Sequence, residues 1–565
     1  MLTSDDDAAI RSTLKGVLDG LRAQDVELQI TALDGLLHFI STPASAPAPQ
    51  KTADTDVTAQ RKTRFASLAH EMGVFPLLHD TAARALHAGA DADAASPTTD
   101  APFDVLLSRL PLVFTQCLAP LEKNESVLKK LVRDYCVAPV LAASPTDRRL
   151  LQQATASCLL LSALFLANAK LALWCVQQSA NDGTAFLTKV HDFLVASNTF
   201  VDPRALVRRL QEIWVDCVAS VCGVENGTAC VPSLLRVEIY KMLRASLDHD
   251  DLVLRASALS IQIKIAVVEK ALDAESADAQ FLIDRIFDVL EEAHDYEKRA
   301  IERQLFWSGA SPKERGIEAL SYVITLTHVK NAFVKRPKAI ASVFEVDFAA
   351  SNKDNAAKPT PSGAHAHVGY RSNVYYGIGY ILHHVLTSEA ALKKKQMEGM
   401  DITPEQYEEL QKALKQKSTL DDGDSPESVQ ARVRQLVASS HVLTTLVQLL
   451  KYTTTRSRNV VEMATLSALH AAECADVRGK LVQRGVFQAL IPLSLHSSSS
   501  STSPSSSSET PRRPARWHRD LERRGPSDGQ DLDLDEPESR AVVVAVLVDQ
   551  VAAGAVQGRL AAAAV

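Results

Sequence analysis

Cysteine and histidine are the residues of this sequence with the most versatile chemistry, because they bind metal ions and serve as nucleophiles or proton carriers. Cys217, Cys222 and Cys230 lie within one short stretch, but their spacing does not match the paired cysteines of a zinc site. We interpret them as core or loop residues.

Four histidines raise the same question of metal binding. His365 and His367 lie in a polar linker, and His383 and His384 flank an apolar helix pattern. No HExxH spacing places two imidazoles on one helix face beside a carboxylate. We therefore expect surface or helix-flank histidines and no metal site.

A further chemical candidate is the glycine pair Gly377 and Gly379 in YYGIGYIL. A phosphate-binding loop would require a preceding strand and a third glycine, and the sequence has neither. Close helix packing is the better interpretation. The sequence also lacks GxSxG, Walker and kinase signatures. We expect no enzyme activity and no cofactor.

The composition indicates a soluble helical protein. The chain has 565 residues, of which 46% are hydrophobic, 23% charged and only 5% aromatic, with 22 glycines. A large β fold would contain more aromatic residues and glycine turns. The net charge of -7 does not suggest a nucleic-acid partner. The cysteines lie mostly among apolar neighbours and the acidic N-terminus lacks an apolar signal core, so we expect a cytoplasmic protein.

Apolar periodicity and loop composition divide the chain into regions. Residues 146–176 are apolar but interrupted by Arg148, Arg149 and Lys170, so we expect a buried helix pair there. The last apolar run is interrupted by Asp549 and Arg559, and we expect no membrane partner. The regions are an N-terminal helical region 1–102 with disordered inserts at 42–62 and 89–102, a central helical domain 103–348, a polar linker 349–370, repeats at 371–495 with a charged insert 389–428, and a disordered tail 496–565.

Residues 311–344 contain three short apolar rows. Ile317, Leu320, Val323, Ile324 and Leu326 fall on one helix face. A second row contains Val329, Phe333 and Val334, and a third follows Pro337 with Ile340, Val343 and Phe344. The pattern predicts three short helices in succession.

Residues 460–493 repeat this arrangement, with Met463, Leu466 and Leu469 before Leu481, Val482 and a break at Gly485. Gly485-Val486-Phe487 also matches Gly73-Val74-Phe75. A helical unit of about 40 residues is typical of armadillo and HEAT arrays. We predict an all-α fold of this type, a right-handed superhelical solenoid. The alternative is an irregular α-helical protein.

Four segments, read together, resemble the UCS family of myosin-directed chaperones, the Unc, Cro and She proteins. The resemblance covers roughly 105–495. It rests on ERGIEALSYVITLTHVKNAFV (314–334), NVYYGIGYILHHVLTS (373–388), QARVRQLVASSHVLTTLVQLLK (430–451) and GKLVQRGVFQALIPLSL (479–495).

The resemblance implies a non-catalytic armadillo-repeat protein that binds the myosin motor domain and assists its folding and assembly. Animal members carry an N-terminal tetratricopeptide domain that docks the ninety-kilodalton heat-shock chaperone. Residues 1–100 lack that pattern and look more like the shorter fungal members, which leaves this second partner open. The family's repeats also continue where this sequence becomes Ser- and Arg-rich after 495, and we expect a truncated or mispredicted C-terminus.

The candidate protein-binding groove lies in the region of best resemblance. Asparagine amides can pair with a peptide backbone, and aromatic rings can anchor side chains. The candidates are Asn373, Tyr375, Tyr376, Tyr380, Arg432 and Arg434. The alternatives are core packing for the tyrosines and a solvated helix face for the arginines. We expect a myosin co-chaperone, with a generic armadillo or HEAT scaffold as the alternative.

Overall fold

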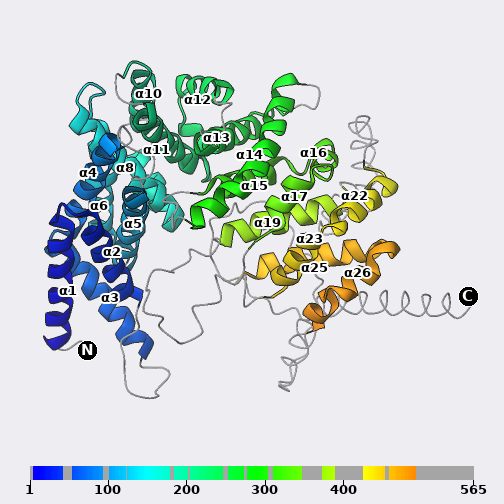
Figure 1. Cartoon of the computed structure of the whole chain (residues 1–565), viewed down its shortest axis with the longest axis horizontal. Helices are drawn as coiled ribbons and strands as arrows, with labels where there is room; N and C mark the ends of the chain where they lie inside the picture. The colour runs from blue at the N-terminus through cyan, green and yellow to red at the C-terminus, as the bar shows by residue number, and fades with distance from the viewer. Residues whose placement is uncertain are drawn as a thin grey trace, which may run out of the picture. The chain divides into compact units, whose positions relative to one another are not determined.

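The computed structural model shows an all-α protein (Figure 1). Within the described residues there are helices and turns and no β-strand, which confirms the prediction of an all-α, helical-repeat fold. The right-handed superhelical course stays a prediction. The described residues are 4–41, 54–92, 101–122, 124–178, 184–200, 204–245, 252–272, 276–302, 310–346, 372–388, 424–451 and 457–491.

The chain divides into two compact units. Among the described residues, the first unit contains those up to 270 and those of 292–315, and the second contains the rest. The division runs through helices α14 (Ala277–Glu302) and α15 (Pro312–Val323), whereas the sequence placed a boundary in the linker 349–370. That linker, the charged insert up to residue 423 and the tail from residue 492 lie outside the described residues.

The first unit is built from helices that follow one another along the chain. They are α1 (Ser4–Arg22), α2 (Val26–Ser41), α3 (Asp54–Glu71), α4 (Val74–Ala92), α5 (Ala101–Leu118), α6 (Glu125–Val132), α7 (Ala138–Ala142), α8 (Arg148–Ala167), α9 (Ala169–Gln177), α10 (Ala185–Ser197), α11 (Arg204–Cys222), α12 (Ser233–Ala245) and α13 (Leu252–Val268).

Helices of the first unit stack on one another in the order of the chain. α1 packs on α4, α4 on α8, α8 on α11, and α11 on α13, while α2 packs on α5 beside this row. Such contacts between a helix and its counterpart in the next repeat are how helical arrays bury apolar faces that single repeats would expose. A row of stacked helices therefore runs through the first unit.

The apolar segment 146–176 forms the predicted buried helix pair, α8 and α9. Asp147 caps α8 by accepting a hydrogen bond from the Leu150 amide at 3.1 Å. α8 is long and apolar enough to cross a membrane by length and composition alone, but 72% of its apolar window is buried inside the protein. A core helix that contacts α4, α5 and α11 accounts for this burial.

The N-terminal inserts are shorter than predicted. Residues from Asp54 onward belong to α3, and α4 and α5 extend to Ala92 and from Ala101. Half of the residues from 54 to 71 are good helix formers, and none of them is proline. The predicted insert 42–62 was therefore wrong in its C-terminal half.

The three helices predicted for 311–344 are α15, whose residues from Gly316 belong to the second unit, and α16 (Thr327–Phe333) and α17 (Pro337–Phe344), which belong to it entirely. α15 begins with a capping box, because the Ser311 amide donates to Glu314 Oε2 at 2.8 Å and the Glu314 amide donates to Ser311 Oγ at 3.1 Å. Pro337 occupies the first turn of α17, where its missing N–H costs nothing. The unit continues with α19 (Ser372–Leu386), α22 (Pro426–Ala438), α23 (Ser440–Leu449), α25 (Arg458–Glu473) and α26 (Arg478–Gln483).

Glycines allow close packing of successive helices in this unit. A Cβ at Gly377 of α19 would lie 3.1 Å from Ile317 Cγ2 of α15, and one at Gly379 would lie 3.5 Å from Met463 Cε of α25. The 3.1 Å approach at Gly377 is tighter than ordinary van der Waals contact and supports the interpretation of close packing there, whereas 3.5 Å at Gly379 is an ordinary contact distance. α19 therefore lies between α15 and α25, as in Figure 1.

The two Gly-Val-Phe sequences have the same local structure. Gly73 follows α3 with φ +78°, and Gly485 follows α26 with φ +82°, a left-handed conformation that glycine adopts without strain. The valine after each glycine is buried. Each Gly-Val-Phe sequence therefore marks a place where one helix ends at the glycine and the next helix begins.

Candidate protein-binding site

Helix α19 presents a row of three aromatic side chains on one face. Tyr376, Tyr380 and His384 are four residues apart, the spacing that aligns side chains on a helix. The Tyr376 and Tyr380 ring centroids are 6.1 Å apart and stacked, and those of Tyr380 and His384 are 4.1 Å apart. All three side chains are partly exposed, and burial raises the pKa of Tyr376 above its ordinary value. We call these residues the aromatic row.

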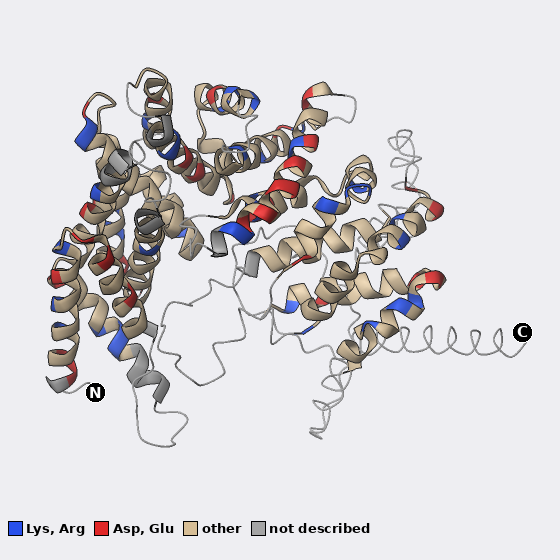
Figure 2. Ribbon diagram, in the orientation of Figure 1, with Lys and Arg blue, Asp and Glu red and all other residues tan. Residues whose placement is uncertain are grey.

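α19 carries no Lys, Arg, Asp or Glu, as the uncoloured helix in Figure 2 shows. The polar groups of the aromatic row are therefore phenol hydroxyls and imidazole nitrogens, which can donate or accept hydrogen bonds without a fixed charge. Such a surface suits an uncharged or aromatic protein segment better than an ion.

The other two candidates on α19 behave differently. Tyr375 is buried, with 3% of its surface exposed, so its ring belongs to the core and cannot line an open groove. Tyr376 is the next residue along α19, so its side chain projects in a different direction around the helix axis. Its ring is therefore partly exposed while that of Tyr375 is buried. Asn373 lies in the first turn of α19, and its side chain falls outside the described part of the chain.

Arg432 is not a groove residue, and that prediction was wrong. Its side chain is 2% exposed and lies among helices α16, α19 and α22. Its guanidinium donates to Val385 O at 3.2 Å, to Asn331 Oδ1 at 3.1 Å and to Asp424 Oδ1. A guanidinium whose donors are used internally is a structural element, because breaking these contacts would leave a buried charge uncompensated.

Lys330 joins Arg432 in this buried cluster. Its ammonium donates to Thr387 O at 3.3 Å and lies 3.7 Å from Asp424 Oδ2. The two cations therefore share one carboxylate, and both donate hydrogen bonds to backbone carbonyl oxygens at the C-terminal end of α19, where the helix dipole is negative. The cluster fixes the end of α19 against α16 and α22.

Arg434 lies on the opposite, solvated face of α22. Its Nε donates to Asp476 Oδ2 at 2.8 Å, and the side chains of Arg434 and Asp476 are 48% and 64% exposed. The structure therefore separates the two arginines that the sequence grouped, because side chains two positions apart on a helix face different sides.

His383, which the sequence predicted at the surface or at a helix flank, lies in the last turn of α19 and is buried. Its ring centroid lies 5.7 Å from that of His384 and 5.7 Å from that of His470 on α25. His365 and His367 lie outside the described residues. Within the described ranges, no group of three or more His, Cys, Asp or Glu side chains has a geometry that could hold a metal ion.

The cysteine side chains are mostly packed in the core. Cys217 and Cys222 are buried, and Cys230 is half-buried in a short 3-10 turn. Burial raises the pKa of Cys117 and of Cys175 to about 12, and that of Cys217 also rises because of its contact with Cys158 and its burial. Such thiols are poor nucleophiles at neutral pH.

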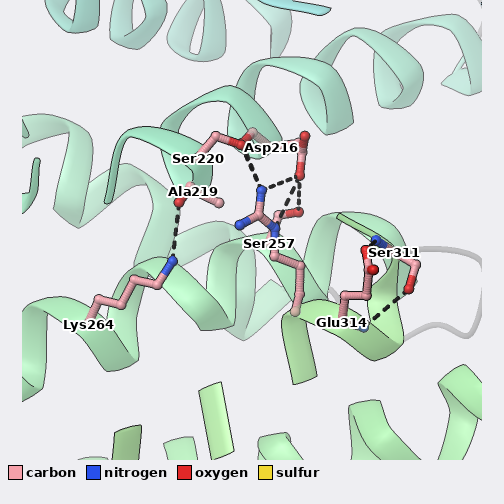
Figure 3. Close-up of polar contacts among 8 residues, drawn as sticks. Asp216, Ala219, Ser220, Ser257, Lys264, Ser311 and Glu314 are labelled. Carbon is pink, nitrogen blue, oxygen red and sulfur yellow. Dashed lines mark hydrogen bonds and ion pairs between the residues drawn. The ribbon is translucent and has the colours of Figure 1, made fainter. Parts of the chain in front are cut away.

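The first unit contains a buried polar network that the sequence analysis missed (Figure 3). Arg315 Nη2 of α15 donates to Asp216 Oδ1 and to Ser220 Oγ of α11, each at 2.8 Å. Ser257 Oγ of α13 donates to Asp216 Oδ1 at 3.3 Å, and Lys264 Nζ donates to Ala219 O at 3.2 Å. The network links three helices. The feature of the sequence that could have indicated this network is Lys264, a charged residue inside the apolar run SIQIKIAVV.

Comparisons with known proteins give distant matches. No family model matches the sequence, and no curated protein matches it. Among solved structures, the myosin chaperone UNC-45 from C. elegans, solved with a Hsp90 peptide, matches with 12% identity and a TM-score of 0.29 over 87% of this chain and 60% of that chain. This chain thus spans less than two thirds of that chain.

Two further solved structures match at similar levels. A circular tandem repeat protein with a novel repeat topology has 11% identity and a TM-score of 0.21 over 98% of both chains. A structure from a study of the phosphorylation switch between cadherin and β-catenin has 11% identity and a TM-score of 0.20 over 96% of this chain and 99% of that chain. Similarity at this level assigns the chain to no family.

Proposed function

We propose that this chain is a helical-repeat scaffold that binds other proteins and, more specifically, a co-chaperone that binds the myosin motor domain and assists its folding. The observation that carries the proposal is the aromatic row on α19, within the segment 373–388 that resembles the myosin-directed chaperones. The other segments of that resemblance include α15, α16, α22 and α23, which belong to the same array.

The aromatic row offers a partner both apolar contact and hydrogen bonding. Partly exposed tyrosines anchor protein interfaces because they bury a large ring at a low cost in side-chain entropy. The row is also held in place, since Lys330 and Arg432 fix the C-terminal end of α19. A preordered surface loses less entropy on binding a flexible client segment.

The test is a light-scattering assay of a purified myosin motor domain heated with the full chain. We expect the wild-type chain to suppress aggregation at near-stoichiometric ratio. Tyr380→Leu should reduce protection at least several-fold while the helix content stays unchanged. Tyr322→Leu, which alters an exposed tyrosine on α15, is the matched control and should protect as well as wild type.

Absence of binding and protection by the wild-type chain would remove the myosin client from the proposal. The alternative is a scaffold or adaptor for a different protein. It is favoured by the exposed apolar side chains Leu234, Val237 and Val268, which lie outside the four segments of resemblance and are 70%, 52% and 65% exposed. A client whose binding is lost in Leu234→Ser/Val237→Ser, but kept in Tyr380→Leu, would support this alternative.

A further inference from the structure

Helix α12 of the first unit presents a stripe of exposed side chains to solvent. Leu234, Val237, Lys241 and Arg244 are three or four residues apart, the spacing that places side chains on one helix face. Leu234 and Val237 are 70% and 52% exposed, and Lys241 and Arg244 are also exposed. The opposite face of α12 is buried where the helix packs on α10 and α13 (Figure 1). We call these four residues the α12 stripe.

The end of α13 extends the apolar half of the stripe. Val268 is 65% exposed and directly precedes Glu269, whose carboxylate pairs with Arg236 Nη1 of α12. Because Arg236 lies between Leu234 and Val237 in the sequence, this pair brings the end of α13 beside the first turns of α12. Several aliphatic side chains so exposed in one place are typical of an interaction surface rather than of scattered surface residues.

Arg236 also fixes the backbone around the stripe. Its Nε donates to Val231 O at 3.0 Å and its Nη2 donates to Thr228 O at 3.3 Å, which ties the segment before α12 to the helix. Gln262 Nε2 of α13 donates to Arg236 O at 2.9 Å. The apolar side chains therefore stand on an ordered base, which lowers the entropy lost when a partner binds.

The spacing of the stripe fits a helical partner. Positions 234, 237, 241 and 244 follow the alternating three- and four-residue steps of a heptad seam, along which two helices pack side by side. The first two positions are aliphatic and the last two are basic. A helix that matches this seam carries aliphatic side chains at one end of its contact face and acidic side chains at the other.

The charges on α12 favour that acidic end. Besides the Arg236–Glu269 pair, α12 carries Lys241 and Arg244 and one carboxylate, Glu238. Glu238 lies 3.3 Å from Lys241 Nζ, but the Lys241 side chain is 67% exposed, so water screens the pair and it contributes little. A partner's carboxylates therefore meet a surface of complementary charge beside Lys241 and Arg244.

We propose that the α12 stripe, extended by Val268, is a docking surface for an amphipathic helix of a partner protein. Aliphatic side chains of that helix cover Leu234 and Val237, and its Asp or Glu side chains lie beside Lys241 and Arg244. The surface belongs to the first unit, whereas the aromatic row belongs to the second. This proposal rests on the scaffold function proposed above and is independent of the myosin client.

Fluorescence anisotropy of the full chain with two synthetic peptides tests the proposal. Each labelled peptide is helix-stabilised and carries a row of leucines continued by glutamates in one peptide and by lysines in the other. We expect saturable binding of the glutamate peptide, at least tenfold tighter than that of the lysine peptide. Its affinity should fall as the salt concentration rises, because salt screens the exposed charges.

Substitutions locate the binding on α12. Leu234→Ser/Val237→Ser should weaken the glutamate peptide at least tenfold, and Lys241→Glu should remove the preference for glutamate over lysine. Leu28→Ser, which alters a leucine of α2 that is 53% exposed, is the control and should bind as wild type. Tyr380→Leu should also bind as wild type, which separates this surface from the aromatic row.

The proposal is overturned if the glutamate peptide does not bind, if both peptides bind equally, or if folded Leu234→Ser/Val237→Ser binds as wild type. Analytical ultracentrifugation of the chain without peptide examines a different occupant, a second copy of the chain. We expect the same sedimentation from wild type and Leu234→Ser/Val237→Ser. A wild-type dimer that dissociates in this variant would assign the surface to self-association and overturn the proposal.

Discussion

Gly20 of α1 lies against Ala32 of α2 so closely that a Cβ added to Gly20 would be 2.6 Å from Ala32 Cβ. Ala32 cannot rotate its methyl group away, so Gly20→Ala should force the two helices apart. We expect a loss of about 1–3 kcal/mol in the free energy of unfolding, typical of overpacking. Urea unfolding followed by circular dichroism measures it.

Gly16→Ala is the matched control, one turn earlier in the same helix. A Cβ at Gly16 meets nothing within 4 Å, so only the gain in helix propensity remains. We expect stabilisation by up to about 1 kcal/mol. Destabilisation by both substitutions would show that the close approach of α1 and α2 is wrong.

Arg432 and Arg434 provide a second matched pair, on opposite faces of α22. Arg432→Ala leaves Asp424 and Lys330 in a buried site with lost hydrogen bonds, and should cost about 3–5 kcal/mol. Arg434→Ala removes an exposed pair and should cost less than about 1 kcal/mol. Thermal unfolding of both variants measures the two losses of stability. Equal losses would contradict the prediction that Arg432→Ala costs more than Arg434→Ala.

Thiol labelling tests the burial of the cysteines. Only Cys230 among the eight is not buried, so the native chain should show one rapidly reacting thiol with a disulfide reagent at pH 8. Cys117 and Cys175 should react only after unfolding, because burial raises the pKa of each to about 12 and keeps the thiol protonated. Cys230→Ser should abolish the rapid phase. Rapid labelling of Cys117 in the native protein would be incompatible with this core.

Gly485 tests the repeated helix stop. Its φ of +82° is costly for a residue with a Cβ, so Gly485→Ala should destabilise the second unit by about 1–2 kcal/mol. Gly485→Asn should cost less, because asparagine tolerates this conformation better. Gly479→Ala, in the adjacent α26 with no atom within 4 Å of its Cβ, serves as the control. Comparable effects of alanine and asparagine at 485 would argue against a strained left-handed stop.

The sequence predicted those parts of the fold that depend on local patterns. Apolar spacing and Pro337 placed α15, α16 and α17, and the Gly-Val-Phe echo corresponded to a shared backbone conformation at Gly73 and Gly485. These features are set by helix periodicity and by the φ preferences of two residue types, which a single sequence displays directly.

The parts that depend on long-range packing were not predictable in the same way. Arg432 and Arg434 look equivalent in the sequence, yet burial of Arg432 depends on Asn331 and Asp424 from outside its helix. Likewise, His383 is buried because His470 of α25 packs on it. A polar side chain can occupy a core position when distant partners satisfy it, and no local pattern reveals those partners.

The most direct test of the account is a binding titration of a myosin motor domain with the full chain, by isothermal calorimetry near its unfolding onset and well below it. We predict saturable binding that weakens in Tyr380→Leu and stays unchanged in Tyr322→Leu. Absence of binding at both temperatures, or equal binding by the two variants, would contradict it.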